Sequence, residues 1–209
     1  MPLSKACFGA VLLAAGVALS GCGPKVALVK DVPLPPFGGR HDARTAPAGQ
    51  ARAAAVTMVD WTPTVAERKW RFIIVHHSAT SAGDAAKFDR DHRDRGWDGL
   101  GYHFVIGNGT MSGDGEIEIG PRWAQQKHGA HTKVRGHPEY NELGVGICLV
   151  GNFNETRPSQ AQRQSLVALV RGLMQRYHIP KSRVLGHGML APTDCPGKQF
   201  DYQDLFNRL

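Results

Sequence analysis

The stretch RFIIVHH, residues 71–77, is a run of apolar, mostly β-branched side chains that ends in two adjacent histidines. A run of this kind, without polar alternation, is typical of a strand that is buried on both faces of a sheet. Successive side chains of a strand point to opposite faces, so only one of His76 and His77 can reach a given site. The stretch therefore predicts a core strand with one histidine available for chemistry at its end.

Predicted helices and strands alternate after this run. A polar, helix-permissive segment spans residues 85–95, and an apolar helical stripe follows the N-cap candidate Ser159 and continues to Tyr177. We interpret this stripe as core rather than as a cofactor face. The other predicted elements are strands 102–106 and 116–119, joined across Asn108-Gly109 and Asp114-Gly115 turns, strands 143–150 and 184–186, and a closing helix at 202–209. This order predicts an α/β fold with a central, mostly mixed β-sheet flanked by helices.

The N-terminal segment, residues 1–21, has the layout of a lipoprotein signal peptide, since Lys5 precedes an apolar run and small residues follow it. The run is shorter than the roughly 20 apolar residues that a membrane-spanning helix needs. Its end, LSGC at residues 19–22, resembles the bacterial lipobox, in which Cys22 is lipidated and becomes the first residue of the mature protein. The alternative interpretation is an uncleaved signal anchor.

Residues 22–56 are rich in Pro, Ala, Gly and Arg and have no helical or strand periodicity, so we interpret them as the lipidated cysteine and a flexible tether. Residues 57–209 then form one folded domain of ordinary size. We expect a monomer held at the cell envelope by a lipid anchor on Cys22. Because Gly23 rather than Asp follows the cysteine, we expect the periplasmic face of the outer membrane.

The chain carries a formal net charge of +7. A basic exported domain suits an anionic polymer such as cell wall, or a membrane surface, although ordinary solubilising charge gives the same composition. Nucleic acid is not an expected partner, because the sequence has no basic helix and no interleaving of aromatic and basic residues.

A second informative stretch is GHGMLAPTDCPGK, residues 186–198, which places Cys195 eight positions after His187. Zinc favours imidazole nitrogen and thiolate sulfur, and a catalytic zinc has three protein ligands and an open position. One of the two strand histidines completes such a set. The residues alone leave two alternatives open, a disulfide with Cys148 and a cysteine nucleophile, although no helix begins at Cys195 to lower its pKa.

Five ordered motifs carry a resemblance to a known family: VHHSAT, GYHFVI, GAH, GVGICLVGNF and GHGMLAPTDCPG. Over about residues 70–200 the chain resembles the peptidoglycan recognition protein and phage-lysozyme type N-acetylmuramoyl-L-alanine amidases, the amidase type 2 domain. The resemblance implies Zn²⁺-dependent hydrolysis of the amide between N-acetylmuramic acid and the L-alanine of the peptidoglycan stem peptide. It also implies that His76, His187 and Cys195 bind the zinc. Some members are non-catalytic peptidoglycan-binding modules, which typically lack the cysteine, and this is the alternative function.

The resemblance extends to residues around the metal. Tyr102 matches the family tyrosine that contacts the reacting water, and Thr193, two positions before the cysteine, supplies a second hydrogen-bond donor. For His131 of the GAH motif, two positions are open: lining the substrate groove, or packing on the sheet. We expect Asn141 to tie down the loop before strand 143–150.

The chain also departs from the family. Related cytoplasmic amidases have a glutamate where this chain has Cys148, and they have an aspartate as the third metal ligand. We expect Cys148 to be a buried, inert thiol. That branch, and a carboxylate general base, are therefore not implied. GHGML replaces the frequent GHRD, so contacts made by that Arg or Asp are absent.

Overall fold

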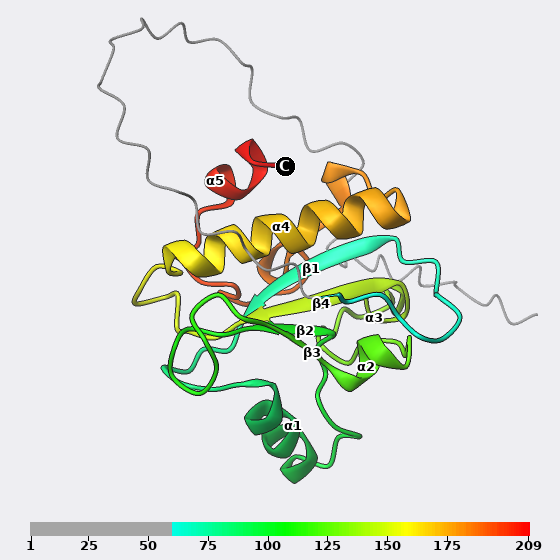
Figure 1. Ribbon diagram of the computed structural model, residues 1–209, viewed down its shortest axis with the longest axis horizontal. Helices are drawn as coiled ribbons and strands as arrows, with labels where there is room; N and C mark the ends of the chain where they lie inside the picture. Colours follow the sequence, from blue (N-terminus) through cyan, green and yellow to red (C-terminus); the bar gives the residue numbers. More distant parts are fainter. Residues whose placement is uncertain (1–59) are drawn as a thin grey trace, which may run out of the picture. The chain divides into compact units, whose positions relative to one another are not determined.

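The protein is described by a computed structural model over residues 60–209 (Figure 1). The predicted signal peptide 1–21, the lipidation site Cys22 and the tether 22–56 lie outside the described residues. Within residues 60–209, no helix combines the length and the apolar character needed to cross a membrane.

The described elements follow the predicted alternation of strands and helices. In chain order they are β1 (Phe72–His77), α1 (Ala85–Asp94), β2 (Phe104–Ile106), β3 (Ile117–Ile119), α2 (Pro121–Ala124), α3 (Glu139–Glu142), β4 (Gly144–Leu149), α4 (Gln160–Tyr177), the 3₁₀ turn η1 (Lys181–Arg183), β5 (Val184–Gly186), the 3₁₀ turn η2 (His187–Met189) and α5 (Tyr202–Asn207).

The strands form one mixed sheet in the order β3-β2-β4-β1-β5. Strand β1 pairs in parallel with β4 and β5, β4 pairs in parallel with β2, and β3 runs antiparallel to β2. In Figure 1, α4 lies over one face of this sheet and α1 lies on the other. The predicted α/β class, with a central mixed sheet between helices, is confirmed.

Strand β1 is buried as its apolar composition predicts. Ile73, Ile74 and Val75 are each 0% exposed, because neighbouring strands cover both edges of β1 and other elements cover both of its faces. A strand in this position has no solvent-facing side, which explains why its sequence lacks polar alternation.

Helix α4 begins with the predicted cap. The Ser159 hydroxyl accepts the backbone N–H of Gln162, and the Gln162 side chain accepts the backbone N–H of Ser159, which together form a capping box. The helix buries four residues of the predicted stripe against the odd-numbered side chains of β1: Leu166, Leu169, Val170 and Leu173. This is the larger of two apolar clusters, and the stripe is core, as predicted.

The opposite face of the sheet holds a smaller cluster of Phe88 from α1 with Leu100, Val105, Cys148 and Val150. Cys148 is 0% exposed and its thiol is free. The predicted buried thiol at position 148 is therefore confirmed, and the disulfide between Cys148 and Cys195 is not formed.

Some boundaries differ from prediction. Strand β2 begins at Phe104, so Tyr102 precedes the strand, and α5 ends at Asn207. The four-residue helices α2 and α3 carry too few residues to show a periodicity, and they were not predicted. The predicted turns between β2 and β3 are present, and both glycines adopt positive φ, +85° at Gly109 and +78° at Gly115.

Candidate metal centre

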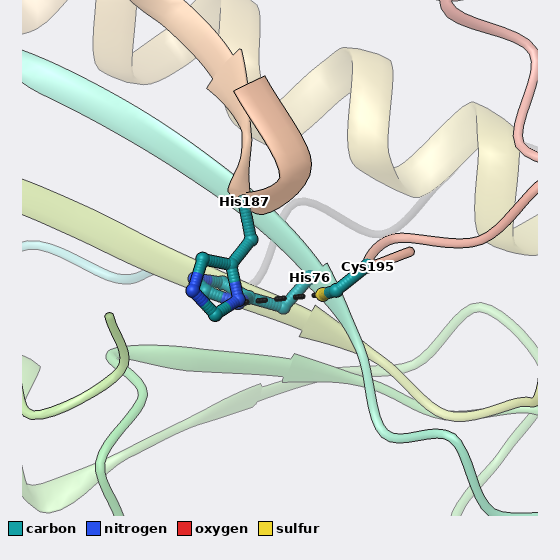
Figure 2. A group of neighbouring side chains, drawn as sticks. All are labelled: His76, His187 and Cys195. Atoms are coloured by element: carbon teal, nitrogen blue, oxygen red, sulfur yellow. Dashed lines mark hydrogen bonds between the residues drawn. The ribbon is translucent and has the colours of Figure 1, made fainter. Parts of the chain in front are cut away.

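Three side chains meet at the edge of the sheet where β1 and β5 end. His76 lies on β1, His187 directly follows β5, and Cys195 lies in the loop after η2 (Figure 2). Their ligand atoms all lie within 4.8 Å of one another. The Sγ atom of Cys195 is 3.6 Å from Nδ1 of His76, and the rings of His76 and His187 have centroids 4.7 Å apart.

The parallel pairing of β1 with β5 explains why the two histidines meet. Val75 is opposite Gly186 in the pairing of β1 with β5, so the next residue on each chain segment, His76 and His187, lies at the same level of the sheet. Neighbouring parallel strands end at the same edge of a sheet, and equivalent positions point to the same face. Backbone pairing thereby brings two of the three candidate ligands together.

The loop that carries Cys195 is closed by its own backbone. The N–H of Gly188 donates to the carbonyl oxygen of Cys195 at 2.6 Å, and the N–H of Cys195 donates to Oγ1 of Thr193 at 3.3 Å. A Cβ atom at position 188 would lie 2.6 Å from the carbonyl oxygen of Thr193, so glycine permits this close approach. Thr193 itself is exposed, and its hydroxyl stabilises the turn.

The donor set and its spacing fit a tetrahedral zinc ion. Zinc bound at about 2.3 Å from sulfur and about 2.0 Å from nitrogen, with tetrahedral angles, requires a sulfur–nitrogen separation of about 3.5 Å. The separation between Cys195 Sγ and His76 Nδ1 is 3.6 Å. Two imidazoles and one thiol are also the donor types that zinc prefers. Within residues 60–209 this is the one group of three or more His, Cys, Asp or Glu side chains with such spacing.

Burial sets the protonation of the three candidate ligands. It lowers the pKa of His76 well below its ordinary value, with the neighbouring histidines as further causes, and it also lowers the pKa of His187. Burial raises the pKa of the Cys195 thiol to about 11, partly offset by the backbone N–H of His77, which donates to Sγ at 3.4 Å. The imidazoles are thus neutral at pH 7, and Cys195 is a thiol rather than a nucleophilic thiolate until a metal displaces its proton.

His77 points away from this cluster, as the alternation of β1 predicts. Its Nδ1 accepts the backbone N–H of Phe153 at 3.1 Å, and its ring lies 5.9 Å from the ring of Phe153. Phe153 belongs to the larger cluster under α4. His77 is therefore a packing residue on the face opposite to His76.

Tyr102 lies against the cluster from the segment before β2. Its ring is tilted on the ring of His76, with centroids 5.2 Å apart. Burial raises the pKa of its hydroxyl well above the ordinary value, and the nearby thiols of Cys148 and Cys195 raise this pKa further. Tyr102 therefore keeps its proton at neutral pH and is able to donate a hydrogen bond at the site.

His131 is buried beneath His76 and is 7% exposed. Its Nδ1 lies 3.0 Å from Nε2 of His76, and its Nε2 lies 3.2 Å from the carbonyl oxygen of Gly144. Burial lowers its pKa to about 4. Of the two positions open from the sequence, the structure places His131 against the sheet.

Two residues near the site escaped the sequence analysis. Trp97 is 45% exposed beside His92, with ring centroids 4.6 Å apart, and His92 in turn lies 5.7 Å from the ring of Tyr102. Arg122 is 3% exposed and donates to the carbonyl oxygens of Leu100 and His128, which fixes the segments on both sides of the site. Neither residue belongs to a motif with recognisable spacing.

One hollow on the described surface lies away from this cluster. It measures about 610 Å³ and is lined by Glu67, Arg68, Lys69, Trp70, Arg71, Tyr177, His178 and Arg183. These residues precede β1 and β5 or lie at the C-terminal end of α4, so the hollow lies at the edge of the sheet opposite to His76 and is separate from the His–His–Cys cluster.

Comparisons with known proteins agree with this geometry. Residues 66–198 match the family described as N-acetylmuramoyl-L-alanine amidase. The chain is 33% identical over 155 residues to the N-acetylmuramoyl-L-alanine amidase of Sus scrofa, covering 66% of this chain and 22% of that protein. It is 31% identical over 166 residues to peptidoglycan-recognition protein LB of Drosophila melanogaster, covering 71% of this chain and 66% of that protein. The chain thus spans less than two thirds of either relative.

Among solved structures, the N-acetylmuramoyl-L-alanine amidase LysC from Clostridium intestinale URNW superposes with a TM-score of 0.57 and 32% sequence identity. The superposition covers 72% of this chain and 93% of that chain. The family match extends over more than half of the sequence and includes all three residues of the His–His–Cys cluster. The chain belongs to the N-acetylmuramoyl-L-alanine amidase family.

Proposed function

We propose that the domain is a zinc-dependent N-acetylmuramoyl-L-alanine amidase that hydrolyses the amide bond between N-acetylmuramic acid and the L-alanine of the peptidoglycan stem peptide. The observation that carries the proposal is the convergence of His76, His187 and Cys195 at one edge of the sheet, with a spacing that fits zinc. A bound zinc ion supplies Lewis acidity, which polarises the scissile carbonyl and activates water for attack.

The residues of the chain supply the remaining functions. The neutral imidazoles of His76 and His187 offer nitrogen lone pairs, and Cys195 offers a thiolate once its proton is lost. The hydroxyl of Tyr102 stays protonated and donates a hydrogen bond to negative charge that develops on the substrate carbonyl. Thr193 lies two residues before Cys195, and its hydroxyl oxygen stabilises the loop that carries Cys195. When substrate is bound, this hydroxyl supplies a second hydrogen-bond donor beside that of Tyr102.

The catalytic function is favoured over a binding module by the completeness of the cluster. A module that only binds peptidoglycan has no need for a buried thiol beside two neutral imidazoles. The amidases among the relatives, of Sus scrofa and Clostridium intestinale, support the same choice. Peptidoglycan is the proposed partner in both cases.

The proposed cellular position follows from the N-terminal sequence. We propose that Cys22 carries the lipid anchor and that residues 22–56 tether a monomeric domain to the membrane at the cell envelope, on the periplasmic face of the outer membrane. This position brings a hydrolase of net positive charge next to the cell wall.

The decisive experiment is incubation of the purified protein with peptidoglycan, followed by mass spectrometry of the soluble products with and without a zinc chelator. An amidase releases stem peptides with a free L-alanine amino group, and the chelator abolishes the release. Binding to peptidoglycan without any release in the presence of zinc would establish the binding module instead.

A further inference from the structure

The imidazole of His76 has a polar neighbour on each of its nitrogen atoms. Nδ1 faces the Cys195 sulfur at 3.6 Å, and Nε2 lies 3.0 Å from Nδ1 of His131. The other nitrogen of His131, Nε2, lies 3.2 Å from the carbonyl oxygen of Gly144, the first residue of β4. One line of hydrogen bonds therefore runs from the sheet backbone through His131 to a candidate metal ligand.

The direction of these hydrogen bonds follows from the group at the end of the line. A carbonyl oxygen only accepts, so Nε2 of His131 carries the proton. His76 and His131 are 1% and 7% exposed as residues, and such burial disfavours a second proton on either ring. Nδ1 of His131 is then an acceptor, and Nε2 of His76 must donate to it. The lone pair of His76 is left on Nδ1, the atom that faces Cys195.

The ring of His131 is held in place from several sides. A Cβ atom at Gly146 would lie 2.3 Å from its Cδ2 atom and one at Gly129 would lie 2.4 Å away, so two glycine backbones contact the ring directly. The side-chain oxygen of Asn141 accepts the backbone N–H groups of His131, at 3.0 Å, and of Thr132, at 3.2 Å. Packing therefore fixes the ring of His131, and the hydrogen bond to Asn141 fixes the backbone of His131.

We propose that His131 is a positioning residue that fixes the tautomer and the ring orientation of His76, so that Nδ1 presents its lone pair to the metal. The proposal rests on the proposed metal site, and it gives His131 a function other than lining the substrate groove. Partners of this kind orient metal-binding imidazoles, and their removal typically costs about 10- to 100-fold in metal affinity.

The first test needs no metal and no substrate. In metal-free protein labelled with ¹⁵N-histidine, we expect an Nε2-bound proton on His76 and a scalar coupling across the hydrogen bond between Nε2 of His76 and Nδ1 of His131. His131→Ala abolishes this coupling. A proton on Nδ1 of His131, or on Nδ1 of His76, in the metal-free wild-type protein would overturn the proposal.

The second test measures zinc affinity by competition with a chromogenic chelator. His131→Ala should bind zinc about 10- to 100-fold more weakly, and His131→Asn should recover most of the loss, because its Oδ1 atom takes the position of the Nδ1 acceptor. His128→Asn is the matched control, since His128 lies in the same segment and is exposed, and its side chain hydrogen-bonds to the carbonyl oxygen of Gly129 and to none of the candidate ligands.

The outcomes separate this proposal from the proposed function. Folding of each variant is verified by circular dichroism, and if His131→Ala does not fold, His131→Asn and His128→Asn carry the comparison. Zinc affinity of His131→Ala within twofold of the wild type, or equal loss in His131→Asn and His131→Ala, contradicts the positioning role. Absence of zinc binding by the wild-type protein contradicts the proposed function, and the coupling in the metal-free protein then decides the role of His131.

Discussion

The sulfur of Cys195 lies 3.6 Å from Nδ1 of His76, although 119 positions separate the two residues in the chain. The contact joins β1, which lies between β4 and β5 in the sheet, to the last loop before α5. At the proposed metal site, removal of either side chain should therefore weaken zinc binding.

Cys195→Ala should lose both bound zinc and amidase activity, because two imidazoles alone hold zinc weakly. The domain should still fold, since Cys195 belongs to neither of the two apolar clusters. Zinc content by elemental analysis and stem-peptide release give the two readouts. Cys148→Ala is the matched control: it removes the other buried thiol and should retain zinc and most activity. Full activity of Cys195→Ala would rule out the amidase proposal.

Zinc binding at pH 8 should release about one proton per ion. Burial raises the pKa of the Cys195 thiol to about 11, so the thiol must lose its proton, whereas His76 and His187, with lowered pKa values, are already neutral. Apparent affinity should therefore rise about tenfold per pH unit from pH 7 and level off as the pH approaches 11. Calorimetry in two buffers with different ionisation enthalpies measures the proton count. A count near zero would show that Cys195 is not a ligand.

Tyr102→Phe should keep zinc but lose catalytic rate. The substitution preserves the ring that packs on His76 and removes one hydroxyl donor. Loss of a single donor of this kind typically lowers kcat by about 10²- to 10³-fold. Tyr140→Phe provides the comparison, since Tyr140 packs on Phe72 at the beginning of β1, away from the cluster. An unchanged kcat in Tyr102→Phe would leave Tyr102 with a packing role only.

His77→Ala should lower stability and leave zinc content unchanged. The change removes the acceptor of the buried N–H of Phe153, and an unsatisfied buried group costs about 1–3 kcal/mol. Urea denaturation gives the free energy of unfolding, and elemental analysis gives the zinc content. His76→Ala is the paired variant and should show the opposite pattern, with zinc lost. Retention of zinc in His76→Ala together with its loss in His77→Ala would reverse the assignment of the two faces of β1.

Cys22→Ser should leave the protein as an unlipidated precursor. The sequence LSGC at residues 19–22 makes Cys22 the predicted acylation site, and Cys7→Ser, inside the predicted signal peptide, should not affect lipidation. Detergent phase partition and the mass of the N-terminal peptide are the measurements. Wild-type protein found entirely in the aqueous phase, with no acyl mass, would exclude the anchor.

The sequence predicted those features that depend on local pattern. The unbroken apolar run of β1 identified a core strand, and the period of two assigned His76 and His77 to opposite faces of the sheet. Ser159 was recognisable as a cap because it stands just before the apolar stripe of α4. Motif order then pointed to His187 and Cys195 as partners of His76.

The contacts that were not predictable depend on the path of the chain between motifs. His131 and His76 are 55 positions apart, and their hydrogen bond depends on how the segment between β3 and β4 folds back beneath β1. That segment contains α2 and α3, whose four residues each are too few to establish a period. The function of Arg122 was not predictable for the same reason. Arg122 acts by donating hydrogen bonds to two backbone carbonyl oxygens, and no spacing of residues in the sequence indicates such contacts.

The hydrogen bond from the Gly188 N–H to the Cys195 carbonyl oxygen has a consequence for how the domain would exchange the proposed metal ion. The bond fastens the two ends of the ligand loop to each other, and strand pairing fixes the level of His76 and His187, so the coordination sphere is preorganised in the folded chain. Loading an ion then requires little additional ordering of the backbone. One divalent ion should consequently replace another by dialysis under native conditions, so that cobalt can be introduced as a spectroscopic probe without unfolding the protein.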